Sequence, residues 1–489
     1  MTDEICSQTL SSLVAALDTK ACTSAEATQA CLERIENTNG VLGSFLQVEA
    51  ESAMNAAKAA DQRRQQGRPL SSLDGVPISL KDNLLTEGVP TQAASRILED
   101  YRPPYDATVV KKLKDAGAVL LGKVNCDEFA MGSSNENSAY GVCKNPWNTA
   151  YSPGGSSGGS AASVASGQSF ASLGTDTGGS VRQPAAFCGV VGLKPSYGRV
   201  SRFGVVAFAS SLDQVGPISR DVRGCAMLLN AIAGHDARDA TSVQTPVANY
   251  LDALQEDLDG LQVGIPQLES FADGLTPSVA LALDDAKRAL AAKGATLVDI
   301  ELPHSQYAVA TYYILASSEA ASNLARYDGV RYGPRKGEEN GLQSLYEETR
   351  GQLFGQEVKR RILLGNYVLS AGYYDAYYVR AQKVRRLIAQ DFQQAFEKVD
   401  VILTPTSPTP AFRLGEKSDD PLQMYLSDIF TIQANLAGIP AISVPGAWTD
   451  EGLPLGIQLM APAFGEEKLF RAAYGLESEL QLESRKPLL

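Results

Sequence analysis

The chain contains a lysine segment and two Gly-Ser clusters whose residue types suit the hydrolysis of an amide bond. The three segments are Asp74-Gly-Val-Pro-Ile-Ser-Leu-Lys81-Asp-Asn, Gly154-Gly-Ser156-Ser-Gly-Gly-Ser160 and Gly174-Thr-Asp-Thr-Gly-Gly-Ser180-Val-Arg. A serine nucleophile needs a nearby base, and histidine usually fills that role. The chain has only two histidines, His235 and His304, and both lie far from these segments in the sequence. Lys81 is therefore the candidate base, as in Ser-Lys hydrolases.

Lys81 can act as a base only where its surroundings favour the neutral amine. An exposed lysine has a pKa of about 10.4 and stays protonated at pH 7, whereas burial lowers the pKa because it disfavours the charged form. Val76, Ile78 and Leu80 alternate just before Lys81, which predicts a strand that delivers the lysine into an interior. The alternative is an ordinary lysine whose ammonium group reaches solvent at a strand end. The serine clusters favour the catalytic interpretation.

The stretch 152–180 is dominated by Gly, Ser and Ala, a composition that is also typical of a flexible linker. Three apolar residues are spaced through it, Val164, Phe170 and Leu173. We therefore expect packed structure, in which glycines allow successive backbone N–H groups to point at one spot. The amides of residues 176–180 can then form an oxyanion hole for a carbonyl group that Ser180 attacks.

Together the three segments resemble the amidase signature family. The catalytic triad of that family is a nucleophilic serine, a bridging serine in a cis peptide and a lysine. The resemblance implies these roles for Ser180, Ser156 and Lys81, in that order. It also implies that the backbone amides of Thr177, Gly178, Gly179 and Ser180 line the oxyanion hole. The similarity runs through essentially the whole chain, with no departure at a triad position.

The later sequence resembles one branch of that family, the A subunits of glutamyl-tRNA(Gln) amidotransferases. The resembling segments are 356–361, 372–378, 381–385 and 428–440. By this resemblance Arg361 holds the α-carboxylate of free glutamine, Asp428 holds its α-ammonium group, and Tyr312 lines the pocket. A guanidinium and a carboxylate suit such a zwitterion. The alternatives are that Arg361 is a solvated residue of a charged helix and that Asp428 caps a helix.

The same resemblance implies the reaction and the partners. The chain is expected to be the glutaminase component of a heterotrimer with B and C subunits, supplying ammonia for ATP-dependent conversion of glutamyl-tRNA(Gln) to glutaminyl-tRNA(Gln). ATP and Mg²⁺ are expected at a partner subunit, with no cofactor or metal on this chain. A stand-alone amidase of the same family and a catalytically idle scaffold are the alternatives. The sequence leaves open whether aspartyl-tRNA(Asn) is also amidated, how far activity depends on partners, and where ammonia travels.

Composition limits what the chain binds. A net charge of −13 disfavours a surface that grips RNA phosphates, so we expect tRNA contacts mainly through a partner subunit. The seven cysteines include no Cys-x-x-Cys pair, which favours reduced thiols over a metal site. The acidic start of the chain is unlike an export signal, and no apolar run is long enough to span a bilayer. We expect a cytoplasmic protein without membrane contact.

Helix and strand signals alternate along the chain. Thr23-Ser-Ala-Glu26 is a capping box that predicts a helix with Gly40 just past its end. Further helices are expected from about residue 108, between residues 276 and 294, and over 371–398; strands are expected at 118–121, 296–300 and 401–403.

Segment 117–123 fits most of a P-loop, but Val124 replaces the required Ser or Thr, and the apolar interior predicts a strand. We expect a single α/β domain over residues 1–489, with a central mixed sheet covered by helices. The catalytic core is expected at about 70–225 and the glutamine-pocket elements at about 305–440.

Overall fold

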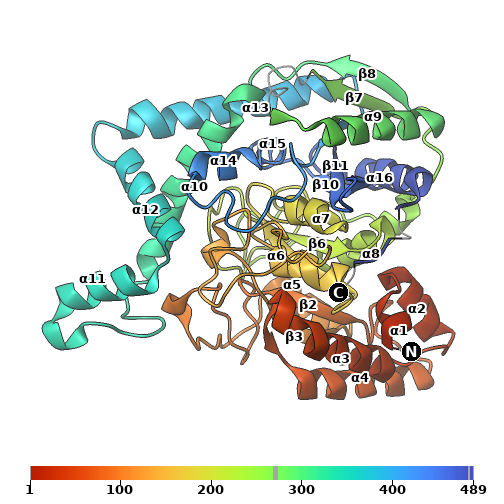
Figure 1. Cartoon of the computed structure of the whole chain (residues 1–489), viewed down its shortest axis with the longest axis horizontal. Coiled ribbons are helices and arrows are strands. Elements are labelled where there is room, and N and C mark those ends of the chain that lie inside the picture. The colour runs from red at the N-terminus through yellow and green to blue at the C-terminus, as the bar shows by residue number, and fades with distance from the viewer. Residues whose placement is uncertain (1, 268–273, 483–484, 488–489) are drawn as a thin grey trace.

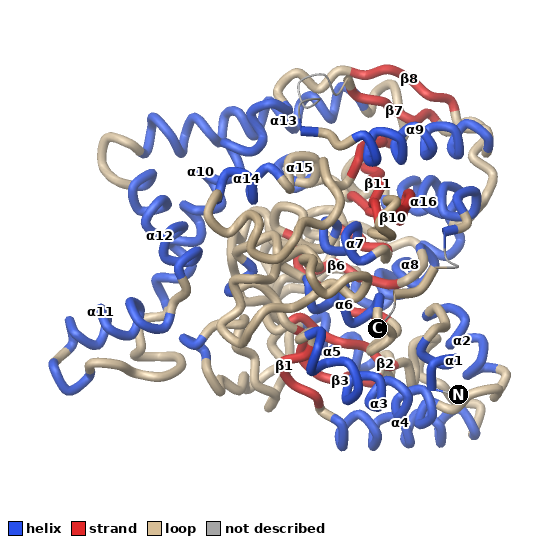
Figure 2. The backbone as a smooth tube through the Cα atoms, viewed as in Figure 1, coloured by secondary structure: helices blue, strands red, loops and turns tan. Residues whose placement is uncertain are grey.

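A computed structural model describes residues 2–267, 274–482 and 485–487 of the protein. One 11-stranded sheet runs through the molecule in the order β1-β3-β2-β4-β6-β5-β10-β11-β9-β7-β8, and helices surround it (Figures 1 and 2). β2 is parallel to both β3 and β4, and β7 is parallel to both β8 and β9, whereas the other pairs are antiparallel. The predicted α/β class with a mixed sheet is confirmed.

The strands are short and mostly buried. They are β1 (Phe45–Val48), β2 (Pro77–Lys81), β3 (Val119–Val124), β4 (Ala171–Asp176), β5 (Val191–Lys194), β6 (Gln214–Ser219), β7 (Gln262–Pro266), β8 (Thr296–Ile300), β9 (Val401–Pro405), β10 (Ala441–Trp448) and β11 (Pro454–Met460).

The helices pack around this sheet, except for an arm that projects on the left of Figure 1. They are α1 (Thr2–Cys6), α2 (Leu10–Asp18), α3 (Ser24–Leu42), α4 (Ala50–Gln65), α5 (Thr108–Asp115), α6 (Gly158–Ala165), α7 (Arg182–Cys188), α8 (Val222–Ile232), α9 (Pro277–Ala292), α10 (Ala308–Asn323), α11 (Leu342–Leu353), α12 (Gln356–Leu369), α13 (Arg380–Ala395), α14 (Pro421–Leu426), α15 (Ile432–Ala437) and α16 (Glu466–Leu480). Within the described residues, no helix combines the length and apolar content needed to cross a bilayer.

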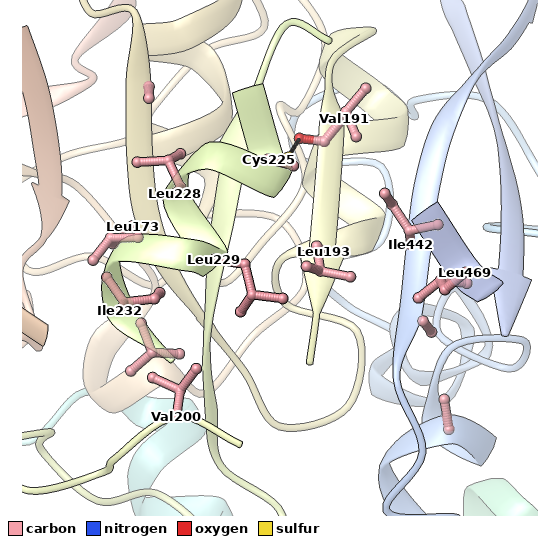
Figure 3. Close-up of a cluster of buried hydrophobic side chains, with 14 of the residues drawn as sticks. Leu173, Val191, Leu193, Val200, Cys225, Leu228, Leu229, Ile232, Ile442 and Leu469 are labelled. Carbon is pink, nitrogen blue, oxygen red and sulfur yellow. Dashed lines mark hydrogen bonds between the residues drawn. The ribbon is translucent and has the colours of Figure 1, made fainter. Parts of the chain in front are cut away.

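The hydrophobic core fixes the strands that carry the candidate chemistry. Helix α8 packs on β5 and β6, and its leucine side chains lie beside those of β4 and β5 (Figure 3). The Cys225 thiol donates a hydrogen bond to the carbonyl of Val191, with Sγ and O 3.5 Å apart. All six residues of β4 are buried, so this strand offers a rigid support for the loop that follows it.

Most of the predicted elements are present. The expected strands correspond to β3, β8 and β9, and the expected helices near residues 108 and 276–294 correspond to α5 and α9. Segment 117–123 leads into β3, as predicted, and its Lys123 is buried with Nζ 3.0 Å from the Thr91 hydroxyl oxygen. A P-loop is therefore absent from this segment.

Two helix boundaries differ from the predictions. The capping box opens α3, but this helix continues through Gly40 to Leu42 and ends at Gly43, whose φ of 63° leaves the helical region. A Cβ on Gly40 would have no atom within 4 Å, so Gly40 lies on an open surface of α3 and does not end the helix. The expected helix over 371–398 is interrupted as well: Gly372 has a φ of 85°, and a π-helical turn, η8 (Tyr374–Val379), precedes α13.

Candidate active site

Lys81 is the last residue of β2 and is fully buried. Its strand lies between β3 and β4, so the sheet shields it on both sides. The Nζ atom lies 2.7 Å from Ser156 Oγ, 2.9 Å from Ser157 Oγ and 3.0 Å from Thr175 Oγ1. These partners are neutral hydroxyl groups, and no carboxylate among the described residues forms an ion pair with the amine.

The electrostatic environment of Lys81 favours loss of its proton. Burial lowers the pKa of Lys81 to about 8, although the charges of Asp127, Asp176 and Asp213 oppose the shift. At pH 7 roughly a tenth of such an amine is neutral, compared with less than about a thousandth of an exposed lysine. Lys81 can therefore accept a proton near neutral pH.

The two Gly-Ser clusters are packed against each other. Every residue from 152 to 180 is buried except the half-buried Ala165, which excludes the flexible-linker interpretation. The peptide bond between Gly155 and Ser156 is cis. The Ser157 amide donates to the carbonyl of Ser180 at 3.1 Å, which places the second serine segment beside the first.

Asp176 and Arg182 form a buried ion pair that shapes the loop around Ser180. The Asp176 carboxylate accepts hydrogen bonds from the Gly179 amide at 2.9 Å and the Val181 amide at 3.2 Å. The Arg182 Nη2 atom lies 2.9 Å from Asp176 Oδ1. Burial disfavours the Asp176 charge, but Arg182 overcomes this effect and holds the pKa of Asp176 at about 2. The Asp176 carboxylate that holds the loop is therefore ionised at every pH near neutrality.

Two of the glycines expected at the oxyanion hole touch other parts of the site. A Cβ on Gly178 would lie 2.6 Å from the Tyr312 hydroxyl oxygen, and a Cβ on Gly179 would collide with Thr431. The Thr431 hydroxyl donates to the Gly178 carbonyl at 2.7 Å. The Gly179 amide already has Asp176 as its acceptor. Tyr312 therefore lies against the loop that carries Ser180.

Asp428 presents a free carboxylate oxygen inside the protein. The Ser133 hydroxyl donates to its Oδ2 atom, whereas Oδ1 is buried without a hydrogen-bond partner among the described residues. Burial raises the pKa of Asp428 to about 7. The backbone carbonyl of Asp428 accepts a hydrogen bond from the Thr431 hydroxyl at 3.0 Å. The same hydroxyl also contacts the Gly178 carbonyl, so Thr431 connects Asp428 to the Ser180 loop. A buried, unpaired carboxylate oxygen is costly unless a ligand donates to it. The caps of the neighbouring helices α14 and α15 are other residues, Asp420 and Thr431 at their N-termini and Ser427 and Gly438 at their C-termini.

Arg361 lies on the inner side of α12 with only 3% of its surface exposed, which excludes a solvated position. Its Nε atom donates to Glu357 at 2.8 Å, and its two terminal nitrogens have no acceptor among the residues that the structure describes. Burial opposes its charge, but Glu357 raises the pKa of Arg361 above the ordinary value. One edge of the guanidinium is thus held, and the other is available to an anion.

Aromatic rings connect Arg361 to the Ser180 loop. The guanidinium carbon lies 5.1 Å from the centre of the Tyr313 ring and 5.5 Å from that of Tyr425. Tyr313 in turn meets Tyr312 edge to face at 5.0 Å. The structure therefore brings the predicted pocket residues from α10, α12 and the turn between α14 and α15 to one place beside β4.

Several contributing residues were not singled out from the sequence. Ser133, Thr431 and Glu357 hold the pocket residues, and Ser157 and Thr175 hold Lys81. Asp176 and Arg182 flank Ser180 within segment 174–182. Two opposite charges so close to a candidate nucleophile could have indicated a buried ion pair. The others come from distant segments that carry no local pattern. In the described part of the chain, no group of three or more His, Cys, Asp or Glu side chains is placed to hold a metal ion.

Comparison with known proteins agrees with this geometry. Residues 26–470 match the amidase family, and the chain belongs to that family. It is 59% identical over 478 residues to the A subunit of glutamyl-tRNA(Gln) amidotransferase from Anaeromyxobacter dehalogenans, covering 98% of this chain and 97% of the relative. The protein of the same name from Chloroflexus aggregans is 55% identical, with 98% of each chain covered.

Solved structures show the same fold. The A subunit of the Thermotoga maritima glutamyl-tRNA(Gln) amidotransferase is 44% identical, with a TM-score of 0.77 over 92% of this chain and 90% of that one. A peptide amidase in complex with chymostatin is 32% identical, with a TM-score of 0.85 over 99% of each chain. The family fold thus serves more than one amide substrate, so the substrate must be argued from the pocket.

Proposed function

We propose that this chain hydrolyses free glutamine and supplies the ammonia to a partner subunit, which uses it in the ATP-dependent conversion of glutamyl-tRNA(Gln) to glutaminyl-tRNA(Gln). The observation that carries the proposal is the set of groups around the Ser180 loop. A buried lysine contacts Ser156, and Asp428 and Arg361 bring a carboxylate oxygen and a guanidinium edge, neither with a hydrogen-bond partner among the described residues, to the side of the Ser180 loop where Tyr312 lies. We assign the catalytic core to about residues 70–225 and the pocket elements to about 305–440.

In the proposed mechanism, Ser180 is the nucleophile and Lys81 the base. Neutral Lys81 accepts the Ser156 proton while Ser156 takes the proton of Ser180, and Ser180 Oγ attacks the side-chain amide carbon of glutamine. The backbone amides of Thr177, Gly178 and Ser180 would donate to the developing oxyanion, whereas the Gly179 amide, which the resemblance also assigned to the oxyanion hole, donates to Asp176. The proton returns through Ser156 to the leaving nitrogen, which releases ammonia and leaves a γ-glutamyl ester on Ser180. Water then attacks the ester to give glutamate and the free hydroxyl.

The charges of the pocket select a zwitterionic amino acid. The terminal nitrogens of Arg361 suit the α-carboxylate, and Oδ1 of Asp428 suits the α-ammonium group. The Tyr312 ring fills the space between the Ser180 loop and Tyr313. A stand-alone amidase acting on uncharged amides has no use for these two buried charges.

The ammonia must reach its acceptor without passing through bulk water, where it would be protonated and lose its nucleophilicity. We therefore propose B and C subunits as partners, in keeping with relatives whose name makes them one component of a larger enzyme. The partners would bind ATP, Mg²⁺ and most of the tRNA, and the complex would work in the cytoplasm. Copurification with B and C subunits, followed by a glutamine-dependent transamidation assay, tests this assignment; full activity on simple amides without partners would contradict it.

Removal of either pocket charge is expected to impair glutamine hydrolysis selectively. Arg361→Ala and Asp428→Asn each leave a substrate charge unpaired in a buried site, a change that costs about 2–5 kcal/mol, or roughly 30- to several-thousand-fold in kcat/KM. The reaction of Ser180 with a small uncharged amide should fall much less. Arg360→Ala is the matched control, because this neighbouring side chain is half exposed and pairs with the same Glu357. Equal losses on both substrates would instead indicate damage to the catalytic groups.

The pH dependence should differ between charged and uncharged substrates. Lys81, with a pKa of about 8, must be neutral, so kcat/KM for an uncharged amide should rise with pH and level off above 8. Glutamine also needs ionised Asp428, whose pKa in the free protein is about 7, so its profile should rise more steeply below pH 7. Asp428→Asn should remove the steeper part. Identical profiles for the two substrates would exclude Asp428 from glutamine binding.

A further inference from the structure

The second half of helix α12 has large apolar side chains on its outer side as well as on its inner side. Towards the protein it buries Val358, Ile362 and Val368, whereas Leu363 is 69% exposed and Tyr367 is 49% exposed. A helix that covers a core normally turns a polar face to solvent. Leu363, Leu364 and Tyr367 in the second half of α12 therefore suit a surface that another molecule covers.

Tyrosines extend this apolar surface across the turn that follows α12. The ring centres of Tyr367 and Tyr373 are 4.4 Å apart, and those of Tyr373 and Tyr377 are 5.9 Å apart. Tyr374 stacks on Tyr378 at 5.2 Å. These rings and the exposed side chains of Leu363 and Leu364 on α12 and Leu387 on α13 define what we call the arm surface. Helix α12 and the turn after it belong to the part of the molecule that projects at the left of Figure 1. Monomeric proteins rarely expose such continuous apolar patches without a binding function.

The arm surface carries positive charge on an otherwise acidic protein. Arg380, Lys383 and Arg386 are exposed on α13, and none of them has an ion-pair partner among the described residues. Asp375 is the only acidic residue between positions 363 and 386, whereas the whole chain has a net charge of −13. The complementary surface is therefore apolar at its centre and rimmed with carboxylates.

We propose that the arm surface docks the partner subunit that receives the ammonia; this inference rests on the proposed function. Tyrosine and arginine are the residues that most often carry the binding energy of protein interfaces. The exposed leucines of the arm surface favour a protein over RNA, which stacks on aromatic rings but gains little from aliphatic side chains. A second copy of this chain fits poorly, because a symmetric contact would bring the two basic arms together.

The position of the arm surface explains why the receiving subunit would bind there. The same helix carries Arg361 on its inner side, where it faces the proposed glutamine pocket. The N-terminus of α12 is also tied to the core, because the Gly355 amide donates to the buried Glu128 carboxylate at 2.7 Å. A partner docked on the outer side of α12 would therefore contact the same helix that carries the proposed ligand of the glutamine α-carboxylate.

The experiment compares variants of the complete chain coexpressed with tagged B and C subunits. The triple variant Leu363→Ser, Tyr367→Ser, Tyr373→Ser should weaken the association at least about a hundredfold, because it removes three large exposed apolar side chains, two of which pack on each other. The charge variant Lys383→Glu with Arg386→Glu should weaken it less and reduce its dependence on salt. Leu281→Ser on α9 and Lys58→Glu on α4 are matched controls, as both positions are exposed and distant from the arm. Acylation of Ser180 by an uncharged substrate should stay unchanged in all variants and reports an intact fold.

The outcomes separate this inference from the proposed function. A wild-type chain that fails to bind B and C subunits would contradict the proposed function itself. A wild-type complex that forms, with arm variants that bind equally well, would overturn the docking inference alone. Loss of tRNA binding by the isolated chain, with binding to the B and C subunits unchanged, would assign the arm surface to RNA. A change in self-association measured by sedimentation, with binding to both partners intact, would assign it to a second copy.

Discussion

Ser180→Ala is expected to lower glutamine hydrolysis by at least about 10⁴-fold, the loss that follows removal of the nucleophile in other serine hydrolases. The fold should survive, because the change removes one hydroxyl group and leaves the backbone contacts of the loop in place. In particular, the Gly179 and Val181 amides still donate to Asp176. Release of glutamate from glutamine by the purified complex measures the loss.

The defect of Ser180→Ala should be confined to the production of ammonia. The assembled complex should still form glutaminyl-tRNA when an ammonium salt replaces glutamine, because the partner receives its nucleophile directly. Ser160→Ala is the matched control, since its buried hydroxyl lies in the first Gly-Ser cluster and, among the described residues, donates a hydrogen bond only to the Leu173 carbonyl, at 3.5 Å. Loss of the ammonium-dependent reaction as well would assign Ser180 a role in assembly.

The catalytic segments could be predicted because their chemistry is local. The alternation of Val76, Ile78 and Leu80 indicated a buried strand before Lys81, and the structure has β2 there with all five residues buried. The glycines of the two clusters are needed because neighbouring backbone and side chains leave no room for a Cβ. At Gly159, for example, a Cβ would approach the Asn125 backbone within 2.6 Å. Steric requirements of this kind can be recognised in the sequence, because they are met by glycine at fixed positions.

The side chains that hold the site residues in place cannot be recognised in this way, because they come from segments far apart in the chain. Arg182 donates to Gln458 at 2.6 Å and to Asn435 at 2.7 Å, and Ser133 donates to Asp428. Nothing near Ser133 in the sequence marks it as the partner of an aspartate almost three hundred residues later. Only the tertiary structure shows that one oxygen of Asp428 is satisfied and the other is free.

The outer side of α12 illustrates a different limit of sequence patterns. Periodicity assigns an apolar stripe to the core, but the second half of α12 has apolar residues on both its buried and its exposed side. Leu363 and Ile362 are adjacent and chemically similar, yet one is exposed and the other is buried. The sequence alone cannot decide which stripe packs on the core of this chain and which remains for a partner.

Lys81→Arg is expected to be about as inactive as Lys81→Ala, with glutamine hydrolysis lowered by at least about 10³-fold in both variants. Arginine keeps a long cationic side chain but does not lose its proton in proteins, so it cannot accept one from Ser156. The wild-type lysine can do so because burial lowers its pKa to about 8. Activity should be measured per folded molecule, with glutamine and with an uncharged amide, because a lost base impairs both reactions.

Lys123 provides the matched control for the loss of a buried lysine. It lies on the neighbouring strand β3, is fully buried, and has its pKa lowered by burial to about 8, as Lys81 does. Its Nζ atom, however, contacts the Leu84 carbonyl and the Thr91 hydroxyl rather than a serine of the site. Lys123→Met should therefore reduce thermal stability but keep most of the activity per folded molecule. An active Lys81→Arg enzyme would mean that this position supplies a fixed positive charge, and the base would then have to be another group near Ser180.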